Sequence, residues 1–310
     1  MAEFVSRDRY VETDSPEAAD LVLYLETGDY KWKTHGELLS QQVILQRYAS
    51  KTLVYNESDA AAVFLDGVYV HSERSKFVPG HQRSWLQTWL YNEEVYRVSA
   101  DQIASAPAGP LCSFQGNLSH RVRQKIVRHF ERNPDPRFRI ELTKEWYDHT
   151  VDRKRSYVDT LLESPFTLCP RGLGAFTQRF VEVMSLGRVP VVIADDWVPP
   201  RDLNLEEVAV VVPEKDVSTI VERVMQASPR AREMGAAGRA YWLARYAPEV
   251  RLERLFDEAF DLLESMGGKA PTLADYQERW RSRDFLAGNG WLWRQRLGLR
   301  LRRLFMPDPR

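Results

Sequence analysis

Residues 164–200 read SPFTLCPRGLGAFTQRFVEVMSLGRVPVVIADDWVPP, and this stretch decides the fold. Residues 166–169 are a short apolar run, residues 177–184 have helical spacing, and a second apolar run at 189–193 follows Gly187. A strand, a glycine loop, a helix and a strand within about 30 residues predict one βαβ unit with a right-handed crossover. Open sheets built from such units bind ligands at the carboxyl ends of their strands.

The loop after the first of these strands carries a cation and two glycines. Arg171 is followed by Gly172 and Gly174, and the loop opens onto the predicted helix. Backbone N–H groups, the positive end of a helix dipole and a guanidinium together suit a phosphate. The glycines would let the backbone approach a ligand closely. The loop lacks both G-x-G-x-x-G and a Walker lysine, so it predicts neither a dinucleotide site nor a P-loop.

Length and composition indicate an ordinary two-domain globular protein. The chain has 310 residues, of which 44% are hydrophobic, and a net charge of −1. The balanced charge gives no reason to expect a nucleic-acid partner. Two cysteines, Cys112 and Cys169, fit a reducing compartment and need not pair. We expect a cytoplasmic protein, because no apolar run approaches a transmembrane length of about 18 residues and no signal-peptide core is visible.

Strand and helix patterns alternate along the chain and predict an α/β protein with two Rossmann-like domains, each a parallel sheet covered by helices. The first domain, 1–107, has predicted strands at 21–25, 52–55 and 62–65 and helices at 36–48 and 84–95. A Pro/Gly cluster at 107–110 marks the boundary. The second domain, 108–248, has predicted strands at 111–114, 137–142, 166–169, 189–193 and 208–212. Its predicted helices run from an N-cap at Ser119 to Phe130, and over 152–162, 177–184 and 216–225. Residues 249–310 are predicted to be a long helix (248–266) and a basic tail.

The opening stretch resembles the exostosin-like family of glycosyltransferases. That family carries a segment close to CPRG-x-G-x-x-x-x-R-x-x-E, then a glycine, then Pro-Val and an acidic pair before a proline. The matching residues here are Cys169, Pro170, Arg171, Gly172, Gly174, Arg179, Glu182, Gly187, Pro190, Val191, Asp195, Asp196 and Pro199. The likeness is strong over 157–214. A weaker likeness extends back to Ser15 and includes the segment 114–117, followed by Arg121 and Arg123. The chain departs from the family in its shortness and in having Thr167 where a second cysteine is often found.

The resemblance implies the two-domain GT-B arrangement and an inverting, metal-independent glycosyltransferase. The implied substrates are a nucleoside diphosphate sugar, expected to be UDP-linked, and a glycan or lipid-linked acceptor. Two alternatives stay open. One is a GDP-fucose-type transferase, which would bind a purine nucleotide. The other is a catalytically inactive subunit that binds nucleotide sugar within a glycan-synthesis complex.

The predicted donor site lies in the second domain. Arg171 and Arg179 are the candidates for stabilising the leaving diphosphate. Glu182, three residues after Arg179 on the same helix side, is implied by the resemblance to bind the ribose hydroxyls. Gly172 and Gly174 would allow close backbone approach. Gly116, Asn117 and Ser119, after the first strand of the domain, could bind phosphate or sugar, or form only a turn and an N-cap.

The catalytic base should come from the first domain, since the acceptor hydroxyl must lose its proton. Polar candidates follow its predicted strands: Glu26, Asp29, Glu57, Asp59, Asp66 and His71. The densest group is residues 56–59, which favours Asp59, with Glu57 second. Asp195 and Asp196 are the nearest approach to a metal site, but an adjacent pair at a strand end is a poor chelate. No metal or other cofactor is therefore expected.

The C-terminal tail has a different composition. Residues 279–310 contain nine Arg and two Asp, a net charge of +7, so the remainder of the chain carries −8. Written as a helix, Trp293, Leu297, Leu301 and Leu304 share one side and Arg296, Arg300 and Arg303 the other. This pattern is typical of an interfacial helix on an anionic membrane. Packing against the first domain and binding of a partner chain are the two alternatives.

Overall fold

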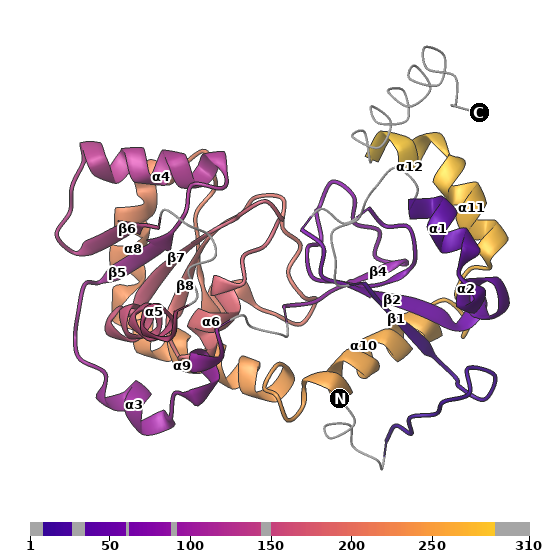
Figure 1. The fold of residues 1–310 in the computed structure, drawn as a ribbon. Helices are drawn as coiled ribbons and strands as arrows, with labels where there is room; N and C mark the ends of the chain where they lie inside the picture. Colours follow the sequence, from indigo (N-terminus) through magenta and orange to yellow (C-terminus); the bar gives the residue numbers. More distant parts are fainter. Residues whose placement is uncertain (1–8, 27–34, 60–61, 88–91, 144–149, 289–310) are drawn as a thin grey trace. The chain divides into compact units, whose positions relative to one another are not determined.

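The computed structural model describes residues 9–26, 35–59, 62–87, 92–143 and 150–288. The chain forms two compact units. Unit 1 comprises Leu86–Arg254, and unit 2 joins the described parts of Ser6–Trp85 and Leu255–Arg310. Each unit has one parallel sheet with helices packed around it (Figure 1). The prediction of two α/β domains with parallel, helix-covered sheets is thereby confirmed.

Unit 1 contains a five-stranded sheet in the order β6-β5-β7-β8-β9. Its strands are β5 (Cys112–Gly116), β6 (Phe138–Leu142), β7 (Phe166–Pro170), β8 (Val189–Ile193) and β9 (Val210–Val211). Its helices are η2 (Glu93–Arg97), α3 (Ala100–Ser105), α4 (Arg121–Arg132), α5 (Val151–Glu163), α6 (Arg179–Ser185), α7 (Leu205–Val208), η3 (Val217–Thr219), α8 (Ile220–Ala227), η4 (Ser228–Arg230) and α9 (Ala231–Arg245). The chain steps from β5 outward to β6 and then back through β7, so right-handed crossovers put α4 on one face and α5 and α6 on the other.

Unit 2 contains a four-stranded parallel sheet in the order β1-β2-β3-β4. Its strands are β1 (Val22–Glu26), β2 (Thr52–Asn56), β3 (Gly67–Tyr69) and β4 (Gln82–Ser84). Its helices are α1 (His35–Gln41), α2 (Val43–Tyr48), η1 (Ala49–Lys51), α10 (Arg251–Ser265, which begins in unit 1), α11 (Leu273–Arg281) and α12 (Arg283–Gly288). The core combines both ends of the chain, because Tyr276 and Trp280 of α11 pack with Leu39, Val54 and Phe64.

Two predicted elements of the first domain are wrong. Residues 62–65 are not a strand: the strand is β3, which begins at Gly67, where a Cβ would overlap the backbone of Val54 on β2. The apolar side chains of 62–65 are buried against α11 instead. The described residues of the predicted helix 84–95 do not form one either. Ser84 ends β4, and η2 begins only at Glu93.

The unit boundaries differ from those expected at 107/108 and 248/249. Residues 92–107 belong to unit 1, because the Asn92 side chain donates to the Lys154 carbonyl (3.0 Å) and Arg188 donates to the Ile103 carbonyl (3.2 Å). The Pro/Gly cluster at 107–110 therefore leads into β5 from within the unit. The second boundary falls inside α10, between Arg254 and Leu255.

The described start of the basic tail is built into unit 2. Arg279 donates to the Asp66 carboxylate at 2.5 Å, and the Trp280 indole N–H donates to the Phe64 carbonyl at 2.7 Å. Asp66 is fully buried. The expected interfacial helix around residues 291–305 lies outside the described residues. Within the described ranges, no helix is long and apolar enough to cross a membrane.

Candidate functional site

A buried polar network joins three elements of unit 1 beside the carboxyl ends of its strands. Arg179 opens α6 and donates to the Gln115 carbonyl of β5 and to the Tyr157 hydroxyl of α5 (3.2 Å). The Tyr157 hydroxyl donates to the Glu182 carboxylate at 2.6 Å. Arg179 and Glu182 therefore meet through Tyr157 and make no direct ion pair with each other. The Gln115 carbonyl and the Tyr157 hydroxyl thus hold the Arg179 side chain, and the same hydroxyl holds Glu182.

Gly116 provides the space for the Arg179 guanidinium. A Cβ at Gly116 would lie 2.9 Å from Nη2 of Arg179. The guanidinium also sits over the Phe114 ring, 4.9 Å from its centroid. Arg179 Nη1 is buried and has no hydrogen-bond partner in the described protein. One donor of this arginine thus remains available within the network.

A second arginine ties together the two loops that follow β5 and β7. Arg123 of α4 is buried, and its Nε donates to the Arg171 carbonyl at 3.1 Å. Its Nη1 donates to the Asn117 side-chain oxygen, also at 3.1 Å. A Cβ at Gly172 would come within 3.2 Å of Arg123 Nη2 and 3.7 Å of the Ser119 hydroxyl. Gly172, Asn117 and Ser119 therefore lie together, as their shared sheet edge predicts.

Arg171 supplies positive charge to this edge, and His120 lies close to it. The Nε of Arg171 is buried without a hydrogen-bond partner in the described protein. His120, rather than the predicted Ser119, is the N-cap of α4, and its Nδ1 accepts from the Val122 N–H at 3.3 Å. Burial, and next the neighbouring Arg171, lower the pKa of His120 below its ordinary value. His120 is therefore a neutral cap that lies close to a guanidinium.

Burial shapes the protonation of the network. It raises the pKa of Glu182, although the Tyr157 hydroxyl and Arg179 act in the opposite direction. It also raises the pKa of the neighbouring Cys169 thiol to about 12. Cys112 and Cys169 are both buried and unpaired. The thiols are therefore structural at neutral pH, since a nucleophilic cysteine needs a lowered pKa.

The structure brings most of the predicted donor residues to one edge of the sheet. Arg171, Gly172, Asn117 and Ser119 gather around Arg123, whereas Arg179, Gly116 and Glu182 gather around Tyr157. Gly174 is buried in the loop between β7 and α6. Sequence reasoning did not assign Tyr157, Gln115 or His120. No local pattern within the predicted helix 152–162 marks Tyr157 as a site residue, and Gln115 acts through its backbone carbonyl, which carries no side-chain signal.

Unit 2 places the two predicted base candidates after β2. Asp59 is exposed and lies 3.3 Å from Nε2 of His71, a buried side chain that follows β3. Glu57 accepts from the Tyr55 hydroxyl at 2.5 Å. Asp66 is fully buried between Arg279 and His81, so this candidate is a structural carboxylate. Glu26 accepts from the Asn56 amide, and Asp29 lies outside the described residues.

Asp195, the first residue of the acidic pair after β8, joins two loops. The Asp195 carboxylate accepts from the Glu214 N–H at 3.0 Å, and the Glu214 carboxylate accepts from the Asp195 N–H at 3.2 Å. This reciprocal pair connects the ends of β8 and β9. Across the described ranges, no group of three His, Cys, Asp or Glu side chains is close enough to hold a metal ion.

Comparison with known proteins gives one family match. Residues 103–227 match the Exostosin GT47 domain. Over 104 residues the chain is 32% identical to the probable glucuronosyltransferase GUT1 of Oryza sativa subsp. japonica, covering 33% of this chain and 22% of the relative. Over 78 residues it is 42% identical to the Exostosin-1 homolog of Caenorhabditis elegans, covering 24% of this chain and 20% of the relative. The chain thus spans less than a quarter of either relative.

The solved structures that resemble the chain are distant in sequence. A glycosyltransferase from Rickettsia africae superimposes with a TM-score of 0.43 at 8% identity, covering 78% of this chain and 84% of that one. Anabaena Alr3699/HepE, solved in complex with UDP and glucose, superimposes with a TM-score of 0.42 at 10% identity, covering 77% of this chain and 70% of that one.

Proposed function

Because residues 103–227 match the Exostosin GT47 domain, we propose that this protein is a glycosyltransferase that uses a nucleoside diphosphate sugar. The observation that supports this most is the buried Arg179–Tyr157–Glu182 network beside the Arg171 loop. The donor we propose is UDP-linked, the acceptor is a glycan or a lipid-linked sugar, and the anomeric centre is inverted.

In the proposed complex, the donor diphosphate contacts the edge formed by Arg171 and the N-terminus of α4. Two arginines, Arg171 and Arg179, each have a buried guanidinium nitrogen with no hydrogen-bond partner in the described protein. A guanidinium aimed at the diphosphate stabilises the charge that develops on it as the sugar leaves. Glu182, held by Tyr157, keeps one carboxylate oxygen for the ribose hydroxyls.

Asp59 is the proposed general base. Its carboxylate is exposed, so an acceptor hydroxyl could reach it, and His71 positions it from the buried side. Removing the hydroxyl proton makes the oxygen a better nucleophile for direct displacement of the diphosphate. Glu57, already accepting from Tyr55, is the second candidate.

The transfer is proposed to need no metal, because arginines can neutralise the leaving diphosphate where other enzymes use a divalent ion. We therefore predict that transfer activity persists in excess EDTA. The measurement is donor turnover with and without chelator, followed by addition of Mg²⁺ or Mn²⁺. Loss with EDTA and recovery with either metal would contradict metal independence and make Asp195 and Asp196 the first ligands to test.

The deciding experiment for the function is calorimetry with UDP and GDP, followed by a donor-turnover assay with UDP-sugars. We expect UDP to bind and a UDP-sugar to be consumed. Binding of GDP in preference to UDP would favour the fucosyltransferase alternative. Nucleotide binding without turnover of any donor, in the presence of a range of acceptors, would indicate an inactive binding subunit.

A further inference from the structure

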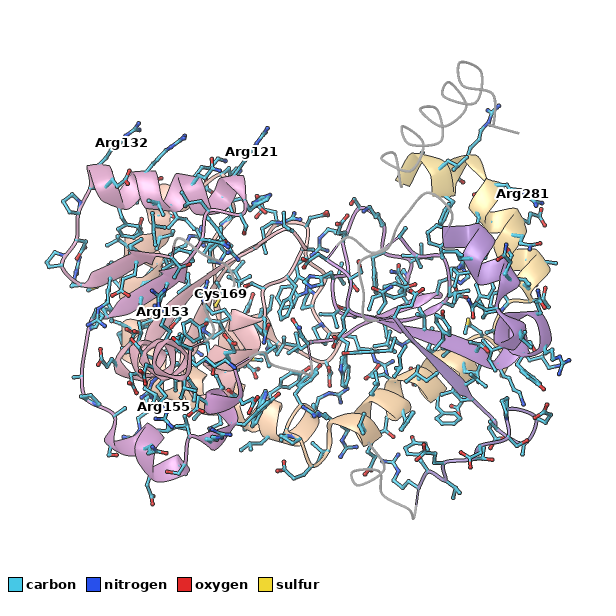
Figure 2. All side chains as sticks on the ribbon, in the orientation of Figure 1. Arg121, Arg132, Arg153, Arg155, Cys169 and Arg281 are labelled. Atoms are coloured by element: carbon cyan, nitrogen blue, oxygen red, sulfur yellow. The ribbon has the colours of Figure 1, made fainter. Side chains whose placement is uncertain are left out.

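The outward face of α4 carries a row of four basic side chains. Arg121, Lys125, Arg128 and Arg132 are all exposed. At 100° per residue they fall within a 60° sector of the helix and extend over roughly 16 Å, since an α-helix has 3.6 residues per turn and rises 1.5 Å per residue. Figure 2 shows Arg121 and Arg132 at the two ends of the helix, both projecting away from unit 1. We call these four residues the α4 stripe.

A recess of about 370 Å³ adjoins the stripe and adds one further cation, Lys215. Its walls are Lys125, Arg128, His129, Arg132 and Asn133 of α4 and its C-cap, and Lys215, Val217 and Ser218 near η3. In the part of the chain that the structure describes, neither the four stripe residues nor Lys215 has a salt-bridge partner. Other surface arginines of unit 1 do have one: Arg97, Arg137, Arg139 and Arg155 each pair with a carboxylate. The local positive charge is therefore uncompensated.

We propose that the α4 stripe and its recess bind a linear polyanionic glycan carrying carboxylate or sulfate groups. A row of single charges along a convex helix matches a chain with repeated anionic groups, and the recess gives one of those groups, with its sugar ring, a place to enter. The stripe begins next to His120 and Arg171, so a bound chain would lead from the recess to the proposed donor edge. The role of the stripe as an acceptor-binding surface rests on the proposed function. The binding of a polyanionic glycan to the stripe does not.

A membrane is a poorer match for this surface. Interfacial helices bind bilayers by inserting an apolar face. The apolar residues of α4, Val122, Ile126, Val127 and Phe130, are buried in unit 1. Glu131 lies outside the basic sector, so the exposed row itself contains no carboxylate.

The test is fluorescence-monitored binding of polygalacturonate oligosaccharides to the full chain, with neutral maltodextrins of equal length as the comparison. The variant Arg128→Gln/Arg132→Gln removes two stripe charges and keeps good helix formers. Its matched control is Arg155→Gln/Arg232→Gln, which removes two exposed helical arginines elsewhere on unit 1. We expect polygalacturonate to bind and maltodextrin not to, with the affinity at least tenfold weaker in the stripe variant and within twofold of wild type in the control.

Several results would overturn the proposal: no polygalacturonate binding, equal binding of maltodextrin, or equal losses in the two variants. Binding of phosphatidylserine vesicles but not of polygalacturonate would also contradict the proposal, and would indicate that the surface binds a membrane. UDP affinity is measured in the same samples. Loss of glycan binding in the stripe variant with intact UDP affinity would show that the stripe binds the glycan independently of the nucleotide. Absent UDP binding in wild type would contradict the donor proposal and leave the glycan proposal unaffected.

Discussion

At the scale of single residues, the site depends on arginines that are buried and used in different ways. Arg123 makes its hydrogen bonds to the two loops, so its role is to position them. Arg179 has two roles, because it donates to Gln115 and Tyr157 and still has one nitrogen without a partner in the described protein. Burying a guanidinium without full pairing costs stability, which a ligand phosphate would recover.

Arg179→Ala is expected to weaken UDP binding at least tenfold, since charge-assisted hydrogen bonds contribute about 1.5–3 kcal/mol. Calorimetry measures the affinity, and circular dichroism checks that the variant is folded. Arg188→Ala is the matched control: Arg188 donates to the Leu162 and Ile103 carbonyls of the same unit, away from the donor edge. The control should lose stability and keep its UDP affinity. An unchanged UDP affinity in folded Arg179→Ala would place the diphosphate elsewhere.

His120 gives a prediction about pH. Its pKa is lowered in the folded protein, so its stabilising contribution is present above its unfolded pKa of about 6.5 and is lost as pH falls through the folded pKa. Protonation also removes the lone pair that accepts from Val122.

Chemical denaturation between about pH 7.5 and pH 5 should therefore show unfolding free energy falling with acid more steeply in wild type than in His120→Asn. Asparagine keeps an N-cap acceptor but does not titrate. Parallel curves for the two proteins would contradict this role of His120.

At the scale of elements, the sequence predicted β5 to β8 and their helices well because each has an apolar run or a regular apolar spacing followed by a loop. At 62–65, where the predicted strand was wrong, the apolar residues pack against α11, which lies more than 180 positions later in the chain. For the same reason, the contacts of Arg279 and Trp280 could not be predicted from the sequence. Their partners, Asp66 and Phe64, are distant in sequence, and no local pattern indicates such a pair.

The residues of the proposed donor edge also include some that the sequence could predict and one that it could not. Arg171, Gly172, Arg179 and Glu182 could be found because they share one loop and one helix, and the topology of a βαβ unit brings them to the edge. Tyr157 could not be found, because its hydroxyl meets Glu182 only after α5 and α6 pack on the same face. Whether the predicted roles of these residues are correct is decided by the binding experiments.

Arg279→Ala is expected to destabilise unit 2 by about 3–5 kcal/mol, because it leaves the fully buried Asp66 carboxylate without its guanidinium. Arg281→Ala, at an exposed position on the same helix, should change stability by less than about 0.5 kcal/mol. Urea denaturation of both variants measures the difference. Equal effects would mean that Arg279 is not a structural part of the unit.

At the scale of the whole molecule, the proposed functions separate by unit. The proposed donor residues all lie in Leu86–Arg254, and the proposed base lies in unit 2. Hydrogen exchange with and without UDP should therefore show protection in the β5, β7 and α6 segments and none around Asp59. A ligand at 100 times its dissociation constant contributes about 2.7 kcal/mol, enough to slow exchange measurably in unit 1. Protection confined to residues 52–85 would contradict the assignment of the donor to unit 1.

The origin of unit 2 from both ends of the chain has a consequence for biosynthesis. A ribosome releases residues 9–85 well before α11, the helix that covers Phe64 and neutralises Asp66, which begins at residue 273. At about 5–20 residues per second, the early segment waits roughly ten seconds or more for it. Unit 1 is continuous from residue 86 to 254 and can fold in that interval. Residues 9–85 are thus exposed to proteases and chaperones until α11 completes the core of unit 2.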